Sequence, residues 1–324
     1  MSAGCAWRQI LRSNFTNWTL LSDFLELDAL QRTAILPNPR FSLNLPRRIA
    51  QKIEKKTLKD PLLKQFLPLV EENVYTSHFS LDPVGDHLCQ KTEKLIQKYH
   101  GRVLLTCTSA CAMHCRYCFR QNFDYQCKDK TFNNEIEFIR GDSSIREVIL
   151  SGGDPLSLSD DILSSLLTQF NDIPHLKLLR FHTRFPVGIP ERINPSFLEM
   201  LTKSRQQIWF VLHVNHPREL DKDIFNAMKE LQKAGAVILS QSVLLKEVND
   251  SIETLQDLCE ILIDHGIFPY YLHQLDKVQG AAHFEVEESK GRALIEALRQ
   301  RLPGYAIPQY VCEISGKPNK TPIF

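Results

Sequence analysis

Six short runs of β-branched and aliphatic residues recur along the last two thirds of the chain. They cover residues 102–108 (RVLLTCT), 146–152 (REVILSG), 176–184 (LKLLRFHTR), 207–215 (QIWFVLHVN), 236–245 (AVILSQSVLL) and 268–276 (FPYYLHQLD). Runs of this length and composition predict buried strands.

The segments between these runs carry the apolar spacing of helices. In residues 219–235, Ile224, Met228 and Leu231 recur at steps of four and three, and Gly235 is placed to end a helix. Strands that alternate with helices predict a parallel sheet with helices outside it. We therefore expect an α/β fold, a partial (βα)6 TIM-like barrel, with its chemistry at the carboxyl ends of the strands.

The first part of the chain has a different character. Prolines interrupt its helical patterns, as in LPNPRFSLNLPRRIAQKIEK and DPLLKQFLPLVEE. We expect a mostly helical N-terminal extension over residues 1–95, followed by the core barrel and a C-terminal segment over residues 96–324.

Charge and hydropathy narrow the range of partners. The 324 residues include 39 Lys and Arg against 38 Asp and Glu, a net charge of +1, which gives no strong field for nucleic acid or an anionic membrane. No apolar stretch follows a basic start, and none is long enough to span a bilayer. We expect a cytoplasmic protein that binds neither nucleic acid nor membrane.

Cysteines are concentrated in one place. Five of the nine lie between Cys107 and Cys127, and Cys111, Cys115 and Cys118 form a C-x3-C-x2-C motif directly after the first strand. This density indicates a metal site in a reducing compartment better than it indicates disulfides.

Three interpretations of the cysteines compete. A zinc site would need Cys107 or Cys127 as its fourth ligand, although Cys107 shares a strand face with Val103 and Leu105. A chance group of buried thiols is the second interpretation. The third is an iron-sulfur cluster held by three thiolates, which leaves one iron open to a substrate or cosubstrate.

Polar residues also stand at the ends of later strands. Gly152, Gly153 and Asp154 follow the second strand, where the glycines would let the backbone approach a ligand and Asp154 would accept from an ammonium group. An ordinary turn capped by Asp154 or Ser157 is the alternative. His213 and Gln241 are polar positions in apolar runs, and a single such residue is more often a hydrogen-bonded core group.

The C-x3-C-x2-C motif after the first barrel strand closely resembles the signature of the radical S-adenosylmethionine (SAM) superfamily. The resemblance implies a radical SAM barrel in which Cys111, Cys115 and Cys118 bind a 4Fe–4S cluster whose open iron chelates SAM. It also implies that Gly152, Gly153 and Asp154 contact the methionyl amino group. Tyr117 matches an aromatic position near the adenine, and His213 and Gln241 are implied as cofactor-binding residues.

Further motifs resemble one branch of that superfamily. CRYCFRQ, LHVNHPREL, SQSVLLKEVND, PYYLHQLDKVQGAAHF and PNKTPI, in this order, closely resemble the lysine 2,3-aminomutase family over roughly residues 95–324. NPRFSLNLPRRIA and DPLLKQFLP resemble its short bacterial branch, which supplies β-lysine for modification of elongation factor P. The resemblance implies conversion of L-α-lysine to β-lysine by radical 2,3-amino migration on pyridoxal phosphate (PLP). It further implies an external reductant and a functional link to elongation factor P and its lysyl ligase.

The family resemblance assigns roles to the remaining residues. Lys320 matches the lysine that forms the PLP Schiff base, although a lysine so near Phe324 would otherwise read as a solvated charge. Arg120 matches the residue that binds the substrate carboxylate. The matched positions for the distant ammonium of lysine are Asp276 and Glu313, and those for the PLP ring and phosphate are Tyr99 and Arg102.

Two positions depart from the family pattern. Glu313 replaces the Asp of the longer enzymes that act on free lysine, and His273 stands where another contact is a Tyr. Two carboxylates still favour a cationic substrate over the acidic side chain that the sister glutamate mutases bind. A non-catalytic metal-binding regulator, and a radical enzyme acting on another amino acid, remain as alternatives.

Overall fold

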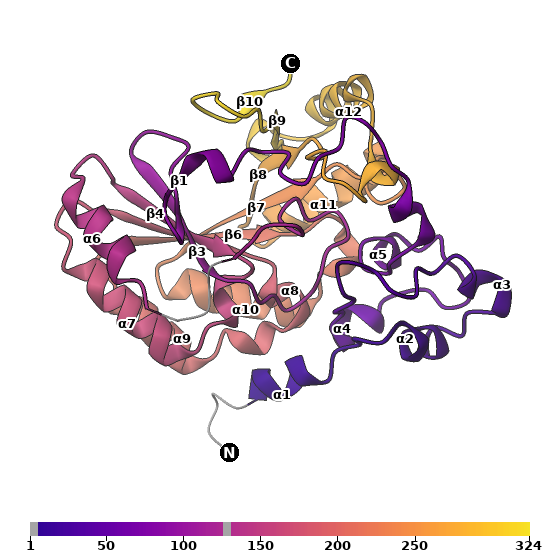
Figure 1. Cartoon of the computed structure of the whole chain (residues 1–324), viewed down its shortest axis with the longest axis horizontal. Helices are drawn as coiled ribbons and strands as arrows, with labels where there is room; N and C mark the ends of the chain where they lie inside the picture. Colours follow the sequence, from indigo (N-terminus) through magenta and orange to yellow (C-terminus); the bar gives the residue numbers. More distant parts are fainter. Residues whose placement is uncertain (1–5, 126–130) are drawn as a thin grey trace.

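A single ten-stranded sheet organises the chain, and helices cover one of its faces (Figure 1). The computed structural model describes residues 6–125 and 131–324. The strands follow one another in the sheet in sequence order. They are β1 (Gln90–Thr92), β2 (Leu95–Ile96), β3 (Arg102–Thr108), β4 (Glu147–Gly152), β5 (Leu178–Thr183), β6 (Gln207–His213), β7 (Val237–Val243), β8 (Phe268–His273), β9 (Gln309–Cys312) and β10 (Thr321–Pro322).

The six strands predicted from the apolar runs are β3 to β8, and all of their neighbouring pairs are parallel. The sheet continues beyond the prediction, because β9 adds a further parallel strand beside β8. Short antiparallel strands then extend both edges, with β1 and β2 beside β3 and with β10 beside β9. The α/β class and the partial barrel are confirmed.

Contacts between the two edges of the sheet show that it curls. Tyr99 lies just before β3 and Glu313 just after β9, yet the Tyr99 hydroxyl donates to Glu313 Oε1 at 2.7 Å. A flat sheet would hold these residues six strand spacings apart. The sheet is therefore a partial barrel with a side opening that side chains bridge.

Strand residues alternate between a packed face and an inner face. In β5 and β7 every second residue is buried, and the residues between them are half-exposed. The buried set, which includes Leu179, Phe181 and Ile238, belongs to the main apolar core under the helices. The half-exposed set therefore lines the concave side of the sheet, where the polar chemistry lies.

In the part of the chain that the structure describes, seven α-helices lie between or after the strands. They are α6 (Asn133–Gly141), α7 (Asp160–Asn171), α8 (Phe185–Gly188), α9 (Pro195–Thr202), α10 (Lys222–Lys233), α11 (Ile252–Asp264) and α12 (Glu288–Arg301). In α10, Ile224, Met228 and Leu231 are buried as their spacing predicts, and Asp221 caps the start. Gly235 follows at φ +89°, a left-handed conformation that glycine adopts without strain, so the helix ends there.

The N-terminal segment packs against the barrel beside α8 and α10 (Figure 1). Its α-helices are short: α1 (Ala6–Arg12), α2 (Trp18–Phe24), α3 (Ala29–Arg32), α4 (Arg47–Ala50) and α5 (Pro61–Lys64). Non-regular chain and isolated bridges, such as Phe15 with Leu45, join them because prolines such as Pro46 and Pro61 restrict how far a helix can extend upstream. Residues of this segment, Leu45 and Phe66 among them, join the same core as the barrel. Among the described residues, no helix has the length and apolar character needed to cross a bilayer.

Candidate active site

The loop after β3 carries Cys111, Cys115 and Cys118, and the N-terminal segment holds its backbone. Asn44 donates its side-chain amide to the Cys111 carbonyl at 3.1 Å and accepts the His114 amide on its own carbonyl at 2.9 Å. Within the loop, the Cys118 amide donates to the Cys115 carbonyl at 3.0 Å. The positions of the three thiols therefore depend on residues that lie far away in sequence.

The three thiols lie near one another. Burial raises the pKa of Cys118 to about 11, with the Cys115 sulfur adding to the increase. Burial likewise raises the pKa of Cys111, with smaller contributions from Asp154, Cys118 and Cys115. Metal binding must displace these protons, so a cluster would form with proton release.

Within residues 6–125 and 131–324, no three His, Cys, Asp or Glu side chains are placed to hold one metal ion. Cys107 therefore forms no such group with the motif cysteines, and Cys127 lies outside the described residues. Cys107 is only 1% exposed and points with Val103 and Leu105 into the core, as the strand alternation predicts. A cubane cluster binds each thiolate at a different iron, so it does not require the thiols to converge on one point.

The two glycines after β4 allow a close approach of backbone to backbone. Gly152 has φ +106°, and a Cβ there would lie 2.8 Å from the Thr108 carbonyl oxygen. The Gly153 amide donates to that same carbonyl at 2.6 Å. The close partner is thus the start of the cysteine loop, which the glycines hold against β4.

Asp154 acts as a cap, which is the alternative that the sequence left open. Its carboxylate accepts from the amides of Leu156, Arg184 and Phe185 and from the Thr183 hydroxyl, at distances from 2.8 to 3.0 Å. Burial raises its pKa to about 6, although these hydrogen bonds act in the opposite direction. Its expected contact with the amino group of SAM stays a prediction, and four protein donors weigh against it.

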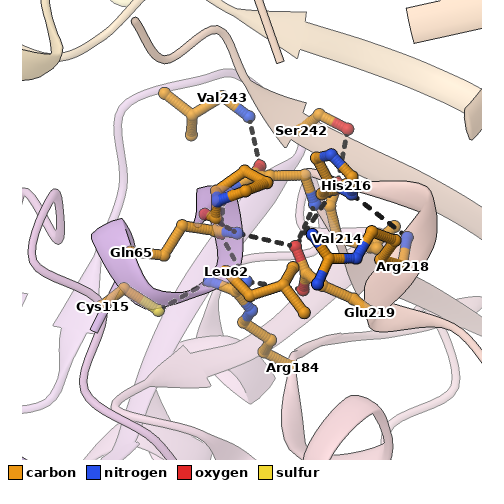
Figure 2. A network of polar contacts seen from close by, with 12 residues as sticks. Leu62, Gln65, Cys115, Arg184, Val214, His216, Arg218, Glu219, Ser242 and Val243 are labelled. Atoms are coloured by element: carbon orange, nitrogen blue, oxygen red, sulfur yellow. Dashed lines mark hydrogen bonds and ion pairs between the residues drawn. The ribbon is translucent and has the colours of Figure 1, made fainter. Parts of the chain in front are cut away.

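A buried polar network joins the cysteine loop to later strands (Figure 2). Arg184, which follows β5, donates to the Cys115 sulfur at 2.9 Å and pairs with Glu219 at 2.6 Å. It also donates to Gln65 Oε1 of the N-terminal segment at 2.8 Å. Tyr117 lies between the cysteines, and its hydroxyl accepts a hydrogen bond from the Asn215 side-chain amide at 2.6 Å. This bond fixes the position of the Tyr117 ring.

Lys320 is placed by the last hairpin of the sheet. Thr321 pairs with Cys312, so Lys320 and Glu313 stand opposite each other at the next position of the hairpin. Their charged groups lie 2.7 Å apart. Burial favours the protonated form of Glu313, but the charge and hydrogen bond of Lys320, with help from Tyr99 and Lys98, lower its pKa overall. The Lys320 side chain, 26% exposed, is therefore held by an ion pair instead of extending freely into solvent.

A chain of charges leads from this pair to Arg120. Lys98 Nζ lies 3.4 Å from Glu313 Oε1 and 2.8 Å from Asp86 Oδ1, and Asp86 Oδ2 accepts from Arg120 Nε at 2.7 Å. Burial would raise the pKa of Asp86, but Arg120 and Lys98 together hold it at about 2. Asp86 accepts from Nε, and Ser151 lies 3.4 Å from Nη1, so among the described residues the Nη2 edge of Arg120 is open to an anion.

Asp276 lies close enough to four charged groups for each of them to affect its pKa. They are Lys320, Glu313, Lys98 and Asp86. It forms no salt bridge with another residue of the described chain. Burial raises its pKa to about 7, and Glu313 and Asp86 act in the same direction. A second cation that entered beside Asp276 would offset this cost.

Imidazoles line the inner face between the cysteine loop and Lys320. His182 and His213 lie with ring centroids 5.5 Å apart, and His273 is 8% exposed. Among the described residues, Nε2 of all three, and Oε1 of Gln241 beside His213, are buried without a hydrogen-bond partner. Burial lowers the pKa of His213 to about 3, and Arg184, Arg120 and Lys320 add to the effect, so the ring is neutral. Buried polar atoms left unpaired indicate a site for a polar ligand.

The structure thus joins Tyr99, Glu313, Lys320, Asp276 and Arg120 into one connected site. Arg102 lies at its outer margin, with its guanidinium 5.7 Å from the Tyr99 ring and its Nε 3.9 Å from Glu147. These residues fit the implied cofactors. Lys320 and the imidazoles without hydrogen-bond partners on the inner face could bind PLP, and the three neighbouring thiols of the loop could bind a cluster.

Sequence reasoning missed Asp86, Lys98, His182, Arg184 and Glu219. His182 and Arg184 stand in or just after an apolar run, the same signal that identified His213. Asp86 and Lys98 gave no such signal, because they lie in polar stretches and their partners are distant in sequence.

Comparison with known proteins gives a consistent result. A family model described as a 4Fe–4S single cluster domain matches residues 100–181. The L-lysine 2,3-aminomutase of Escherichia coli is 42% identical over 87% of this chain and 83% of its own length. That of Haemophilus influenzae is 39% identical over 97% and 94% of the two chains.

More distant proteins were also found. The L-lysine 2,3-aminomutase of Clostridium subterminale is 35% identical over 82% of this chain but only 64% of its own length. A radical SAM methyltransferase structure from Sphaerobacter thermophilus has a TM-score of 0.48 and 16% identity, over 67% of this chain and 68% of its own. The cofactors expected from the sequence, a 4Fe–4S cluster, SAM and PLP, are those of the aminomutases. With 42% and 39% identity over 83% and 94% of the E. coli and H. influenzae relatives, the chain belongs to the L-lysine 2,3-aminomutase family.

Proposed function

We propose that this protein converts L-lysine to β-lysine by moving the 2-amino group to C3. Cys111, Cys115 and Cys118 hold the 4Fe–4S cluster, Lys320 holds PLP, and Arg120, Asp276 and Glu313 bind the substrate. The observation that carries the proposal is the ion pair of Lys320 with Glu313 at 2.7 Å, which connects through Lys98 and Asp86 to Arg120.

When bound, the cluster and SAM would supply the radical chemistry, and PLP would supply the aldehyde that holds the migrating amino group. The protein supplies position. The thiols hold the cluster at the carboxyl end of β3, and the β9–β10 hairpin presents the Lys320 amine to the inner face. In this proposal, Gly152, Gly153, His213 and Gln241 are further cofactor contacts, and Tyr99 and Arg102 contact PLP.

Charges at the two ends of the site support a lysine substrate. The free edge of Arg120 fits the α-carboxylate, and Asp276 with Glu313 fits the ε-ammonium group. The same pair of carboxylates would repel glutamate.

The partial barrel also protects the reaction. Tyr99 bridges the side opening through Glu313, and the apolar core lies behind the inner face. Restricting water at the site protects a reactive radical from side reactions. Residues 1–95 act in this proposal as an extension that holds the cysteine loop, and residues 96–324 as the catalytic core.

We assign the product to modification of elongation factor P. The support is the resemblance of residues 38–50 and 60–68 to the short bacterial branch. The reaction would take place in the cytoplasm, with elongation factor P and its lysyl ligase as functional partners.

The test is anaerobic incubation of reconstituted protein with L-lysine, SAM and a low-potential one-electron reductant, followed by chiral analysis of the products. We expect β-lysine from wild type and none from Lys320→Ala or Cys115→Ala. Parallel reactions with glutamate and ornithine test the alternative substrates. Absence of β-lysine from protein with verified iron, sulfide and PLP would overturn the proposal, and metal without SAM binding would favour a regulator.

The cellular role needs a separate test. Deleting the gene in its own host should remove the β-lysyl mass increment from elongation factor P, and added β-lysine should restore it. An increment that persists in the deletion strain would overturn the assignment and leave the enzymatic proposal intact.

A further inference from the structure

Arg184 is the cationic side chain that contacts a cluster-ligand thiol. Its Nη1 lies 2.9 Å from the Cys115 sulfur, and both residues belong to the network of Figure 2. Among the residues the structure describes, no Lys or Arg donates a hydrogen bond to the sulfur of Cys111 or Cys118. The three thiols therefore have different electrostatic surroundings.

The position of the Arg184 guanidinium is set independently of Cys115. Its Nη2 donates to Glu219 Oε2 at 2.6 Å and to Gln65 Oε1 at 2.8 Å, and its carbon centre lies 4.9 Å from the Phe66 ring centroid. Arg184 is 6% exposed, and Glu219 and Gln65 are fully buried. The charge is thus fixed beside the thiol before any cluster is present.

Glu219 is itself held rigidly. Its Oε1 accepts from the amides of Asn215 and His216, each at 3.0 Å, while Oε2 faces Arg184. The network therefore contains a cation next to the sulfur and an anion one residue further away. In a buried environment, fields of this kind are weakly screened.

A reduced 4Fe–4S cluster carries one more negative charge than the oxidised form. A hydrogen bond and a positive charge at a ligand sulfur stabilise that extra electron, and an anion nearby does the opposite. We propose that Arg184 and Glu219 together set the reduction potential of the cluster, with Arg184 raising it and Glu219 limiting the increase. This inference rests on the proposed function only in requiring that Cys115 binds the cluster.

Arg184 is in this view a positioning and tuning residue. The electron comes from the external low-potential donor, the cluster accepts it, and no bond forms or breaks at Arg184. The pair would keep the cluster low enough in potential to reduce SAM, yet within reach of that donor.

The experiment is a mediated redox titration of reconstituted protein, followed by the electron paramagnetic resonance signal of the reduced cluster, without lysine present. Iron and sulfide are counted for each variant first. Arg184→Gln keeps a hydrogen-bond donor but removes the charge, so its midpoint potential should shift to lower values. Glu219→Gln removes the opposing charge, so its midpoint should shift to higher values.

If Arg184→Gln fails to hold a cluster, Arg184→Lys provides a variant that retains the charge. Its midpoint potential should lie between those of wild type and Arg184→Gln. Arg192→Gln is the matched control, because Arg192 is also fully buried and ion-paired, with Asp160 at 2.8 Å, but does not contact the cysteine loop. Its midpoint should equal that of wild type.

Opposite shifts in Arg184→Gln and Glu219→Gln, with no shift in Arg192→Gln, would establish the inference, because simple loss of packing has no reason to change sign. Unchanged midpoints, or shifts of one sign in all three variants, would overturn it. A wild-type protein that binds no cluster would instead overturn the proposed function.

Discussion

Arg116, between the cysteines, and Glu72, in the N-terminal segment, form a two-point ion pair. Arg116 Nε lies 2.7 Å from Glu72 Oε1, and Nη2 bonds to Oε2. Arg116 is 1% exposed, and its Nη1 also donates to the Phe41 carbonyl at 2.6 Å. The cysteine loop is therefore held from outside the barrel, by residues that precede it by more than forty positions.

Glu72→Gln should destabilise the protein and impair cluster binding, because it leaves the buried Arg116 charge without its counter-ion. Breaking a buried pair in this way costs about 3 kcal/mol. Chemical denaturation of the cluster-free protein measures the stability, and iron content after reconstitution measures cluster binding. Glu71→Gln is the control, since Glu71 is exposed and adjacent. Equal iron loading in both variants would contradict the idea that the Arg116–Glu72 ion pair holds the cysteine loop in place for cluster binding.

Asp154→Asn should reduce stability rather than act on SAM alone. An amide has one oxygen to serve the four donors that the carboxylate now satisfies, so we expect a loss of about 2 kcal/mol. Thermal unfolding of the variant measures it, against Asp172→Asn at an exposed position. A normal melting temperature with weakened SAM binding would instead identify Asp154 as a SAM contact.

Asp276 should make lysine binding depend on pH. With its pKa raised to about 7, the carboxylate is mostly protonated at pH 6 and mostly ionised at pH 8. Because the ammonium of lysine needs the ionised form, KM should fall about tenfold between these values. Asp276→Asn should raise KM and remove this part of the pH dependence. The same dependence of KM on pH in wild type and variant would show that Asp276 is not the group whose ionisation controls lysine binding.

The same carboxyl should affect stability with a defined sign. Its pKa in the folded protein lies above the ordinary value of 3.8, so the folded state gains from protonation at low pH. That contribution is lost as pH rises through 7. Asp276→Asn should therefore unfold at a higher temperature than wild type at pH 8, while Asp264→Asn, at an exposed site, should not.

Glu313→Gln should lower kcat/KM by about 100-fold, because it removes a buried charge that faces Lys320 and that we propose to bind the substrate ammonium. Tyr99→Phe removes one hydrogen bond to the same carboxylate and should cost about fivefold. Glu313→Asp keeps the charge on a shorter side chain, so its loss of kcat/KM should lie between those of Tyr99→Phe and Glu313→Gln. Steady-state kinetics, corrected for PLP content by its imine absorption, distinguish these outcomes. A wild-type kcat/KM in Glu313→Gln would show that Glu313 takes no part in substrate binding.

The barrel could be predicted because each strand carries its own local signal. The apolar runs that became β3 to β8 are buried on one face, and the three cysteines share one loop whose spacing has few alternative explanations. The last strands were missed because β10 spans only two residues and β9 only four. Such short elements form through tertiary contacts and leave little periodicity.

The polar networks could not be predicted for a different reason. Asp86 and Arg120 are 34 positions apart, and Gln65 and Arg184 are 119 apart. Their meeting depends on how the N-terminal segment docks, which no local pattern encodes. Resemblance suggested a role for Arg120 but not for Asp86, the residue that orients it.

The two ends of the site are synthesised in a fixed order. The Arg116–Glu72 ion pair and the cysteine loop precede the hairpin that carries Lys320 along the chain, so they are translated before that hairpin. Because N-terminal regions begin to fold first during translation, the loop that we propose to bind the cluster can begin to organise before the hairpin that we propose to bind PLP has been made. Maturation of the enzyme would then have an order, with iron delivered to a pre-formed loop and PLP captured only when the closing hairpin completes the barrel edge.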